Sequence, residues 1–330
     1  MSVLLSRSAE ELYWLGRHLE RAESLARIFR EHTNLLVDIP TEVDSDWGSL
    51  LALTGSAGRF AAGTAGTDET SVMRFLVADV ANPGSLVHTI AAARENLRVS
   101  RQIVPWSAWE CLNRLHIRVV SEAATTTMSR RKRSELCESV IDSLRHLSGI
   151  LVGTMTRDHA YSFIELARFV ERADMTTRVI DVRAGGLMAG TSAQGMSPED
   201  RSPYEDVRWL GVLRSAGGQQ MYHRAAPVSV QGDAVVAFLV RDAGFPRSVA
   251  HSLGEVGRCL EALPARPGPL AACRQASAAV STGPLPETAA GIHTLMDEFQ
   301  IGIGRIHEAV FSAFFGAGAV VSEVPSSRAG

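Results

Sequence analysis

Apolar residues near the start of the chain recur every three or four positions, the spacing of one face of an α-helix. That face carries Leu12, Leu15, Leu19, Ala22, Ala26 and Phe29. Ser6 or Ser8 is expected to cap the helix, and Glu10 and Glu11 suit the positive end of its dipole. Residues 161–180 have the same periodicity, so the sequence predicts a second long amphipathic helix there.

The rest of the chain alternates between further helical patterns and loop-like stretches. Helical periodicity extends over residues 85–100, 134–154, 248–263 and 288–315. Short apolar runs at 72–80 and 234–240 resemble strands, but no stretch alternates apolar and polar residues, and no hairpin dipeptide joins two β-branched runs. Small and turn-forming residues predict loops at 55–70, 184–203 and 264–286, and a tail over 317–330. The predicted fold class is therefore all-α, a bundle of long helices.

Two segments of the chain repeat each other. Residues 15–23 read LGRHLERAE and residues 166–174 read LARFVERAD. At an offset of 151 residues, Arg17, Glu20, Arg21, Ala22 and Arg27 recur as Arg168, Glu171, Arg172, Ala173 and Arg178. Glu23 recurs as the chemically similar Asp174.

A second repeated pair follows in the same order. Residues 75–79 (FLVAD) match residues 238–242 (FLVRD). At an offset of 163, Pro83, Ser85 and His88 match Pro246, Ser248 and His251. Chance similarity between amphipathic helices would favour Leu and Ala rather than Pro and Arg. We therefore predict an internal duplication, with related halves over residues 1–153 and 154–316 and a flexible tail over 317–330.

The charge balance narrows the classes of partner. The 330 residues contain 33 Lys and Arg against 36 Asp and Glu, a net charge of −3, which argues against a bulk nucleic-acid binder. No apolar run reaches bilayer length and no signal peptide is evident, so we expect a cytoplasmic protein without a membrane partner. The basic run at 129–133 is interpreted as a solvated turn, with contact to nucleic acid or an acidic partner as the alternative.

The repeated helices carry the candidate binding residues. These are Arg17, Glu20, Arg21 and Glu23 in the first copy and Arg168, Glu171, Arg172 and Asp174 in the second. One interpretation is ordinary surface ion pairing at helical spacing. The same charge pattern occurs in both copies, so two further interpretations are considered. The residues could form a buried Glu–Arg network between the halves, or a site for an anion or a peptide terminus.

A second polar group precedes the second copy. It consists of Arg157, Asp158, His159 and Tyr161. Structurally, Thr156 or Asp158 is expected to cap a helix, with His159 on the surface. Functionally, Arg157 and His159 would hold a carboxylate or phosphate at the helix N-terminus.

The usual cofactor and metal signatures are missing. The sequence has no Walker A loop, no G-x-G-x-x-G after a strand, no Glu-x-x-His pair, no G-x-S-x-G and no H-E-x-x-H. The four cysteines, Cys111, Cys137, Cys259 and Cys273, form no C-x-x-C pair and are interpreted as small buried hydrophobes. No cofactor and no metal site is expected.

In its motifs the chain resembles the bacterial alpha-E family. The resemblance rests on residues 5–7, 12–17, 19–23, 82–85, 93–96, 109–113, 171–175 and 245–248, which cover most of the chain in the family's order. Residues 217–223 and 184–203 depart from the expected pattern. Members of the family are usually encoded beside, or fused to, ATP-grasp ligases, so the resemblance implies an ATP-grasp ligase partner in a system that forms or modifies peptide bonds.

Three hypotheses follow for the function. The first is an accessory subunit that presents a peptide substrate to an ATP-grasp ligase, with the Glu–Arg pairs organising a groove and residues 157–159 lining its mouth. The second is a helical enzyme in which His159, or Glu20 or Glu171 with a raised pKa, acts as general base. The third is a purely structural scaffold in which the Glu–Arg pairs tie helices together.

Overall fold

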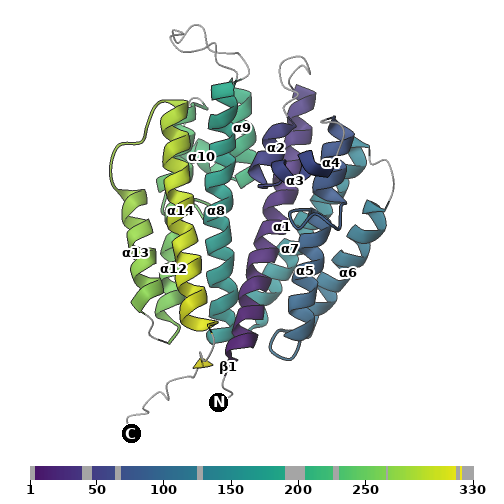
Figure 1. The fold of residues 1–330 in the computed structure, drawn as a ribbon, viewed down its shortest axis with the longest axis vertical. Coiled ribbons are helices and arrows are strands. Elements are labelled where there is room, and N and C mark those ends of the chain that lie inside the picture. Colours follow the sequence, from purple (N-terminus) through teal and green to yellow (C-terminus); the bar gives the residue numbers. More distant parts are fainter. Residues whose placement is uncertain are drawn as a thin grey trace.

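Two long helices lie side by side at the centre of the molecule (Figure 1). They are α1 (Ser6–Asp38) and α8 (His159–Ala189), which contain the two copies of the repeated segment. The computed structural model describes residues 4–38, 47–63, 68–124, 129–189, 205–225, 230–264, 267–316 and 320–321. The central pair confirms both long helices predicted from the hydrophobic periodicity.

Among the described residues, six helices lie between α1 and α8 and six follow α8. Between α1 and α8 lie α2 (Gly48–Leu53), α3 (Ala57–Gly63), α4 (Glu69–Val77), α5 (Leu86–Val99), α6 (Trp106–Ala123) and α7 (Arg130–Thr154). After α8 come α9 (Glu205–Ala216), α10 (Gln219–Ala225), α11 (Gly232–Arg241), α12 (Val249–Glu261), α13 (Pro267–Ser281) and α14 (Ala289–Phe314). A two-residue antiparallel pair, β1 (Leu4–Leu5) with β2 (Val320–Val321), accompanies this all-α architecture.

The two central helices each collect their own set of neighbours. α1 packs against α5 and α7, and α8 packs against α12 and α14, on opposite sides of the molecule in Figure 1. The short helices cross over: α2 packs against α8, and α9 packs against α1. A short helix from each side of the bundle therefore packs on the long central helix of the other side.

Side-chain caps explain where several helices begin. Asp68 accepts hydrogen bonds from the amides of Thr70 and Ser71 at the start of α4. Ser85 and Ser248 cap α5 and α12 by accepting from the amides of His88 and His251. Such a cap satisfies an amide that lacks an intrahelical partner.

Some predictions about the loops were wrong. The basic run at 129–133 is not a turn: Ser129 caps α7, and Arg130 and Arg133 form ion pairs of 2.6 and 2.5 Å with Glu69. The predicted loop at 264–286 contains α13, whose composition of small residues concealed a buried stripe of Cys273, Ala276 and Val280.

Other predicted segments need smaller corrections. The predicted loop at 55–70 contains α3 and the start of α4, and the strand-like runs form α4 and α11. The predicted loop at 184–203 begins inside α8; its residues 190–203 lie outside the described residues. In the predicted tail, Val320–Val321 form β2, and residues 317–319 and 322–330 lie outside the described residues.

Candidate functional site: a buried glutamate–arginine seam

The site lies beside a close approach of α1 and α8. At Gly16 a Cβ atom would be 2.8 Å from the Cβ of Ala167, closer than real side chains approach, and it would also collide with the carbonyl oxygen of Ile164. Glycine at this position therefore lets the helix backbones approach each other. Just beyond it lie the candidate residues, here called the seam: Arg17, Glu20, Arg21 and Glu23 of α1 with Arg168, Glu171, Arg172 and Asp174 of α8.

Glu171 of α8 is held by two arginines of α1. Its side chain is 0 % exposed. Arg17 donates to one carboxylate oxygen through Nε. Arg21 donates to both oxygens, through Nε at 2.6 Å and Nη2 at 3.1 Å. This two-pronged pairing is the geometry in which a guanidinium binds a carboxylate most strongly.

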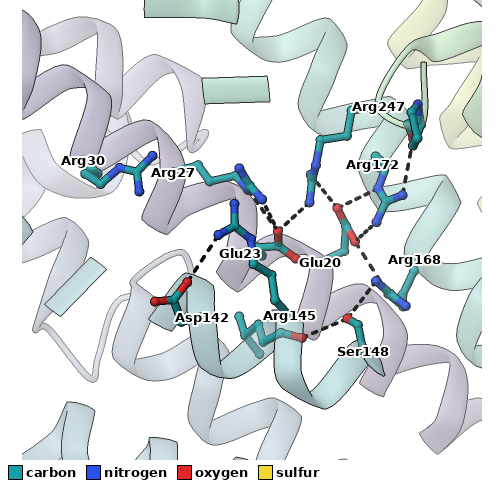
Figure 2. A network of polar contacts seen from close by, with 12 residues as sticks. Glu20, Glu23, Arg27, Arg30, Asp142, Arg145, Ser148, Arg168, Arg172 and Arg247 are labelled. Atoms are coloured by element: carbon teal, nitrogen blue, oxygen red, sulfur yellow. Dashed lines mark hydrogen bonds and ion pairs between the residues drawn. The ribbon is translucent and has the colours of Figure 1, made fainter. Parts of the chain in front are cut away.

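Glu20 of α1 is held in the same way by α8. Its side chain is also 0 % exposed. Arg172 donates to its two oxygens through Nε at 2.8 Å and Nη2 at 2.7 Å, and Arg168 Nε lies 3.6 Å away (Figure 2). Each central helix thus supplies a buried glutamate to the other's arginines. Of the interpretations left open by the sequence, surface ion pairing was wrong, and the buried network is confirmed.

Arg247, between α11 and α12, adds a further cation on one side of the seam. Its Nη1 donates to Glu20 at 2.8 Å and its Nη2 to Glu23 at 2.7 Å, while Arg27 also donates to Glu23 (Figure 2). Arg247 was not among the binding residues predicted from the sequence. The sequence did contain a signal for it. Pro246–Arg247–Ser248 matches residues 83–85 except at the middle position, where the first copy has Gly84 and the second has the charged Arg247.

Asp174, the remaining carboxylate of the seam, and its neighbour Glu165, outside the seam, pair with arginines of their own helix. Asp174 accepts from Arg178 Nε at 2.8 Å. Glu165 accepts from Arg168 at 2.8 Å, and Arg168 also donates to Ser148 Oγ at 3.0 Å. No carboxylate of the seam is therefore left without a guanidinium.

Electrostatics keep the two buried glutamates ionised. Burial alone raises the pKa of a carboxyl group, but the charges and hydrogen bonds of Arg17 and Arg21 outweigh it and lower the pKa of Glu171 to about 2. Burial acts in the same direction on Glu20, where Arg172 and Arg247 outweigh it and lower the pKa. The raised pKa that the enzyme hypothesis required of Glu20 or Glu171 was therefore wrong.

The second predicted polar group lies away from the seam. His159 is 12 residues before Glu171 on α8, about 18 Å along the helix axis. Asp158 caps α8 by accepting from the amide of Tyr161 at 3.1 Å, as expected. Arg157 donates to the carbonyl of Val152 at 2.6 Å, and its guanidinium lies 3.9 Å from the ring centroid of Tyr161. His159 is half-buried, and its Nδ1 is buried with no partner among the described residues.

A third polar cluster has the donor types of a metal site. Among the described residues, Asp181, His293 and Asp297 place ligand atoms within 4.8 Å of one another. His293 Nδ1 is hydrogen-bonded to Asp181, which raises the pKa of the imidazole. About half of the Asp297 side chain is exposed, so this arrangement reads as a surface histidine–carboxylate pair.

Among comparisons with known proteins, a family model matches the chain over a range that includes the Glu-Arg motif of the seam. The model of the Alpha-E family, described as a predicted alpha-helical domain with a conserved ER motif, matches residues 4–315. The dipeptide Glu-Arg occurs in this chain at 20–21 and 171–172, and all four residues belong to the seam. No curated protein and no solved structure matches the chain. Within the described residues, no helix combines the length and the apolar character needed to cross a bilayer.

Proposed function

Since the chain belongs to the Alpha-E family, we propose that it is a helical accessory subunit that works with an ATP-grasp peptide ligase and presents a peptide substrate to it. The partner is the one that the resemblance in sequence implies. The compartment we propose is the cytoplasm. The role of the seam in this proposal is to hold the two sides of the bundle in one fixed geometry, so that a binding surface built across them keeps its shape.

One observation carries the proposal: the reciprocal pairing of Glu20 and Glu171 with arginines of the opposite helix. Both carboxylates are fully buried, and their pKa values are lowered. A general base working near neutral pH needs a pKa near the operating pH and access to its substrate. The two glutamates have neither property, which favours an organising role over a catalytic one.

We also infer that the two halves, residues 1–153 and 154–316, arose by duplication. The reciprocal seam supports this, because the pairing of Arg21 with Glu171 has a counterpart in the pairing of Arg172 with Glu20. The turns before α5 and α12 support it independently. His88 Nδ1 bonds the carbonyl of Val80 at 3.0 Å, and His251 Nδ1 bonds that of Ala243 at 2.8 Å.

The partnership is tested by purifying the tagged full chain from its native cell and identifying what is retained. We expect an ATP-grasp ligase to be retained, and the purified chain to increase peptide-dependent ATP hydrolysis by that ligase. The Glu171→Gln variant, which removes a buried carboxylate of the seam, should lose this effect. Its matched control, Glu95→Gln, removes an exposed carboxylate that is paired with Arg98 on α5, outside the seam, and should keep the effect. Retention of no ATP-grasp protein, or a ligase whose ATP hydrolysis is unchanged by the chain, would falsify the proposal.

A further inference from the structure

A cavity of about 240 Å³ opens beside the seam on the Glu171 side. Its walls include Arg21 of α1, Glu171, Asp174 and Arg178 of α8, and the backbone at Gly55 and Gly84. Gly55 has φ +64° and ends the turn after α2. The cavity therefore lies where the α2 turn and the turn before α5 meet the two central helices.

The corresponding place on the Glu20 side is filled. In the matching tripeptide the residue at the position of Gly84 is Arg247, whose guanidinium bridges Glu20 and Glu23. The space left beside Arg247 is about 20 Å³. At Gly217, which has φ +67°, an added Cβ would lie 3.0 Å from Arg27 Nη1, whereas one added at Gly55 would meet nothing within 4 Å. The difference in volume thus follows mainly from a side chain that one side has and the other lacks.

The cavity presents unused hydrogen-bond donors. Arg21 uses Nε and Nη2 on Glu171, and Arg178 uses Nε on Asp174. Within the described part of the chain, no partner is found for Arg21 Nη1 or for either Nη of Arg178. Their side chains are 30 % and 34 % exposed, against 0 % for Glu171. A molecule that enters therefore meets the guanidinium N–H groups more readily than the carboxylates of Glu171 and Asp174, whose side chains are 0 % and 13 % exposed.

The local charge favours an anion. Arg21 and Arg178 on the cavity wall, together with Arg17, which pairs with Glu171 but lies outside the wall, carry three positive charges against two negative charges on Glu171 and Asp174. A single carboxylate would balance this excess. Guanidinium groups bind carboxylates through paired, coplanar N–H donors. A volume of about 240 Å³ suits a small acid or the last residue of a peptide rather than a folded partner.

We propose that this cavity is a binding site for a carboxylate group, held between Arg21 and Arg178, and that the carboxylate is the C-terminus of a peptide. The choice of a peptide as its carrier rests on the proposed function. The presence of a carboxylate site does not depend on a ligase, because every group that forms the site belongs to this chain.

The test is a calorimetric titration of the purified full chain with N-acetyl-Ala-Ala-Ala bearing a free C-terminal carboxylate. We expect saturable binding with a Kd of about 1 mM or tighter, and at least a tenfold weaker Kd for the same peptide with a C-terminal amide. Sodium acetate and N-acetylalanine are the arms for a free small acid, and we expect both to bind more weakly than the tripeptide acid.

Two variants locate the binding. Gly84→Arg places a guanidinium where Arg247 lies on the other side and should abolish binding. Its matched control, Gly84→Ala, adds only a Cβ 2.9 Å from the movable Ser56 hydroxyl and should bind within threefold of the wild type. Arg178→Gln removes the more exposed guanidinium and should weaken binding at least tenfold, so the proposal stays testable if the Gly84→Arg chain fails to fold.

Three outcomes would overturn the proposal. They are no saturable binding of the acid, equal binding of acid and amide, and unchanged binding in the Arg178→Gln variant. Acetate or N-acetylalanine binding as tightly as the tripeptide would retain the carboxylate site and overturn the peptide as its carrier. No ligase is present in the titration, so a failure to bind the peptide does not contradict the partnership with a ligase. In the same way, a failure to recover a ligase from the cell does not contradict the carboxylate site.

Discussion

Gly16 of α1 faces Ala167 of α8 so closely that a Cβ on the glycine would lie 2.8 Å from the alanine Cβ. Gly16→Ala should therefore destabilise the protein even though alanine favours a helix by up to about 1 kcal/mol. Overpacking of this kind costs about 1–3 kcal/mol. The matched control is Gly149→Ala in α7, where an added Cβ meets nothing within 4 Å and should be neutral or stabilising. Urea denaturation measures both, and equal midpoints would contradict the close approach.

Removing the charge of a buried glutamate should be costly. Glu171→Gln leaves the buried Arg17 and the partly exposed Arg21 beside a neutral amide, and breaking one partner of a buried pair costs about 3–5 kcal/mol. Glu95→Gln removes a carboxylate that is 56 % exposed, and exposed pairs contribute about 0–1 kcal/mol. Chemical denaturation of the two variants should therefore separate them widely. A loss below about 1 kcal/mol in Glu171→Gln would show that the seam does not hold the halves together.

The lowered pKa values predict sensitivity to acid. Glu171 has a folded pKa of about 2, below the value of about 4.3 for an unperturbed glutamate. Its contribution to stability is therefore complete above the unfolded pKa and is lost as the pH falls from about 5 to about 2. Thermal melts across this range should show a falling melting temperature, with a shallower decline in Glu171→Gln. Parallel curves for the wild type and the variant would contradict an ionised Glu171.

Arg247 should matter more than an exposed arginine. Arg247→Ala removes the cation shared by Glu20 and Glu23 and leaves Glu23 to Arg27 alone. We expect a loss of about 2–4 kcal/mol, since a buried carboxylate then lacks part of its compensation. The control is Arg118→Ala on α6, whose side chain is 54 % exposed and should change stability by less than about 1 kcal/mol. Differential scanning calorimetry measures the stability of both variants, and equal losses of stability would contradict the prediction.

The cysteines should react slowly in the native protein. Burial raises the pKa of both Cys137 and Cys259 to about 12 and also raises the pKa of Cys111 and Cys273. Because the thiolate is the reactive form, labelling with Ellman's reagent at pH 8 should be slow until urea unfolds the chain, when all four thiols react. Rapid labelling of any native thiol would show that its surroundings are more open than described.

The sequence predicts the seam well because its chemistry is local and repeated. Spacing alone places Glu20 and Arg21 together on one helix and Glu171 and Arg172 on another. The pattern left open whether the two copies face each other, because that depends on how the helices pack around Gly16. The buried network follows only once α1 and α8 lie side by side.

The parts that sequence analysis missed depend on contacts between distant segments. Arg247 belongs to a turn 227 residues from Glu20, and nothing in the local pattern says which carboxylate it will reach. The helix α13 was predicted as a loop because Gly, Ala, Pro and Ser dominate its sequence, whereas packing against α12 and α14 decides its structure. The basic run before Ser134 was predicted as a turn because its partner, Glu69, lies on another helix.

The crossed packing of α2 on α8 and of α9 on α1 gives the single chain the form of an intertwined dimer. Two identical subunits arranged in this way would carry the same residue at both symmetry-related positions, so any substitution would appear twice. In the duplication that we infer, covalent fusion of the two halves removes that restriction. It allows Arg247 to fill the space on the Glu20 side while Gly84 leaves the cavity on the Glu171 side open. A homodimer encoded by a shorter gene could not maintain this asymmetry.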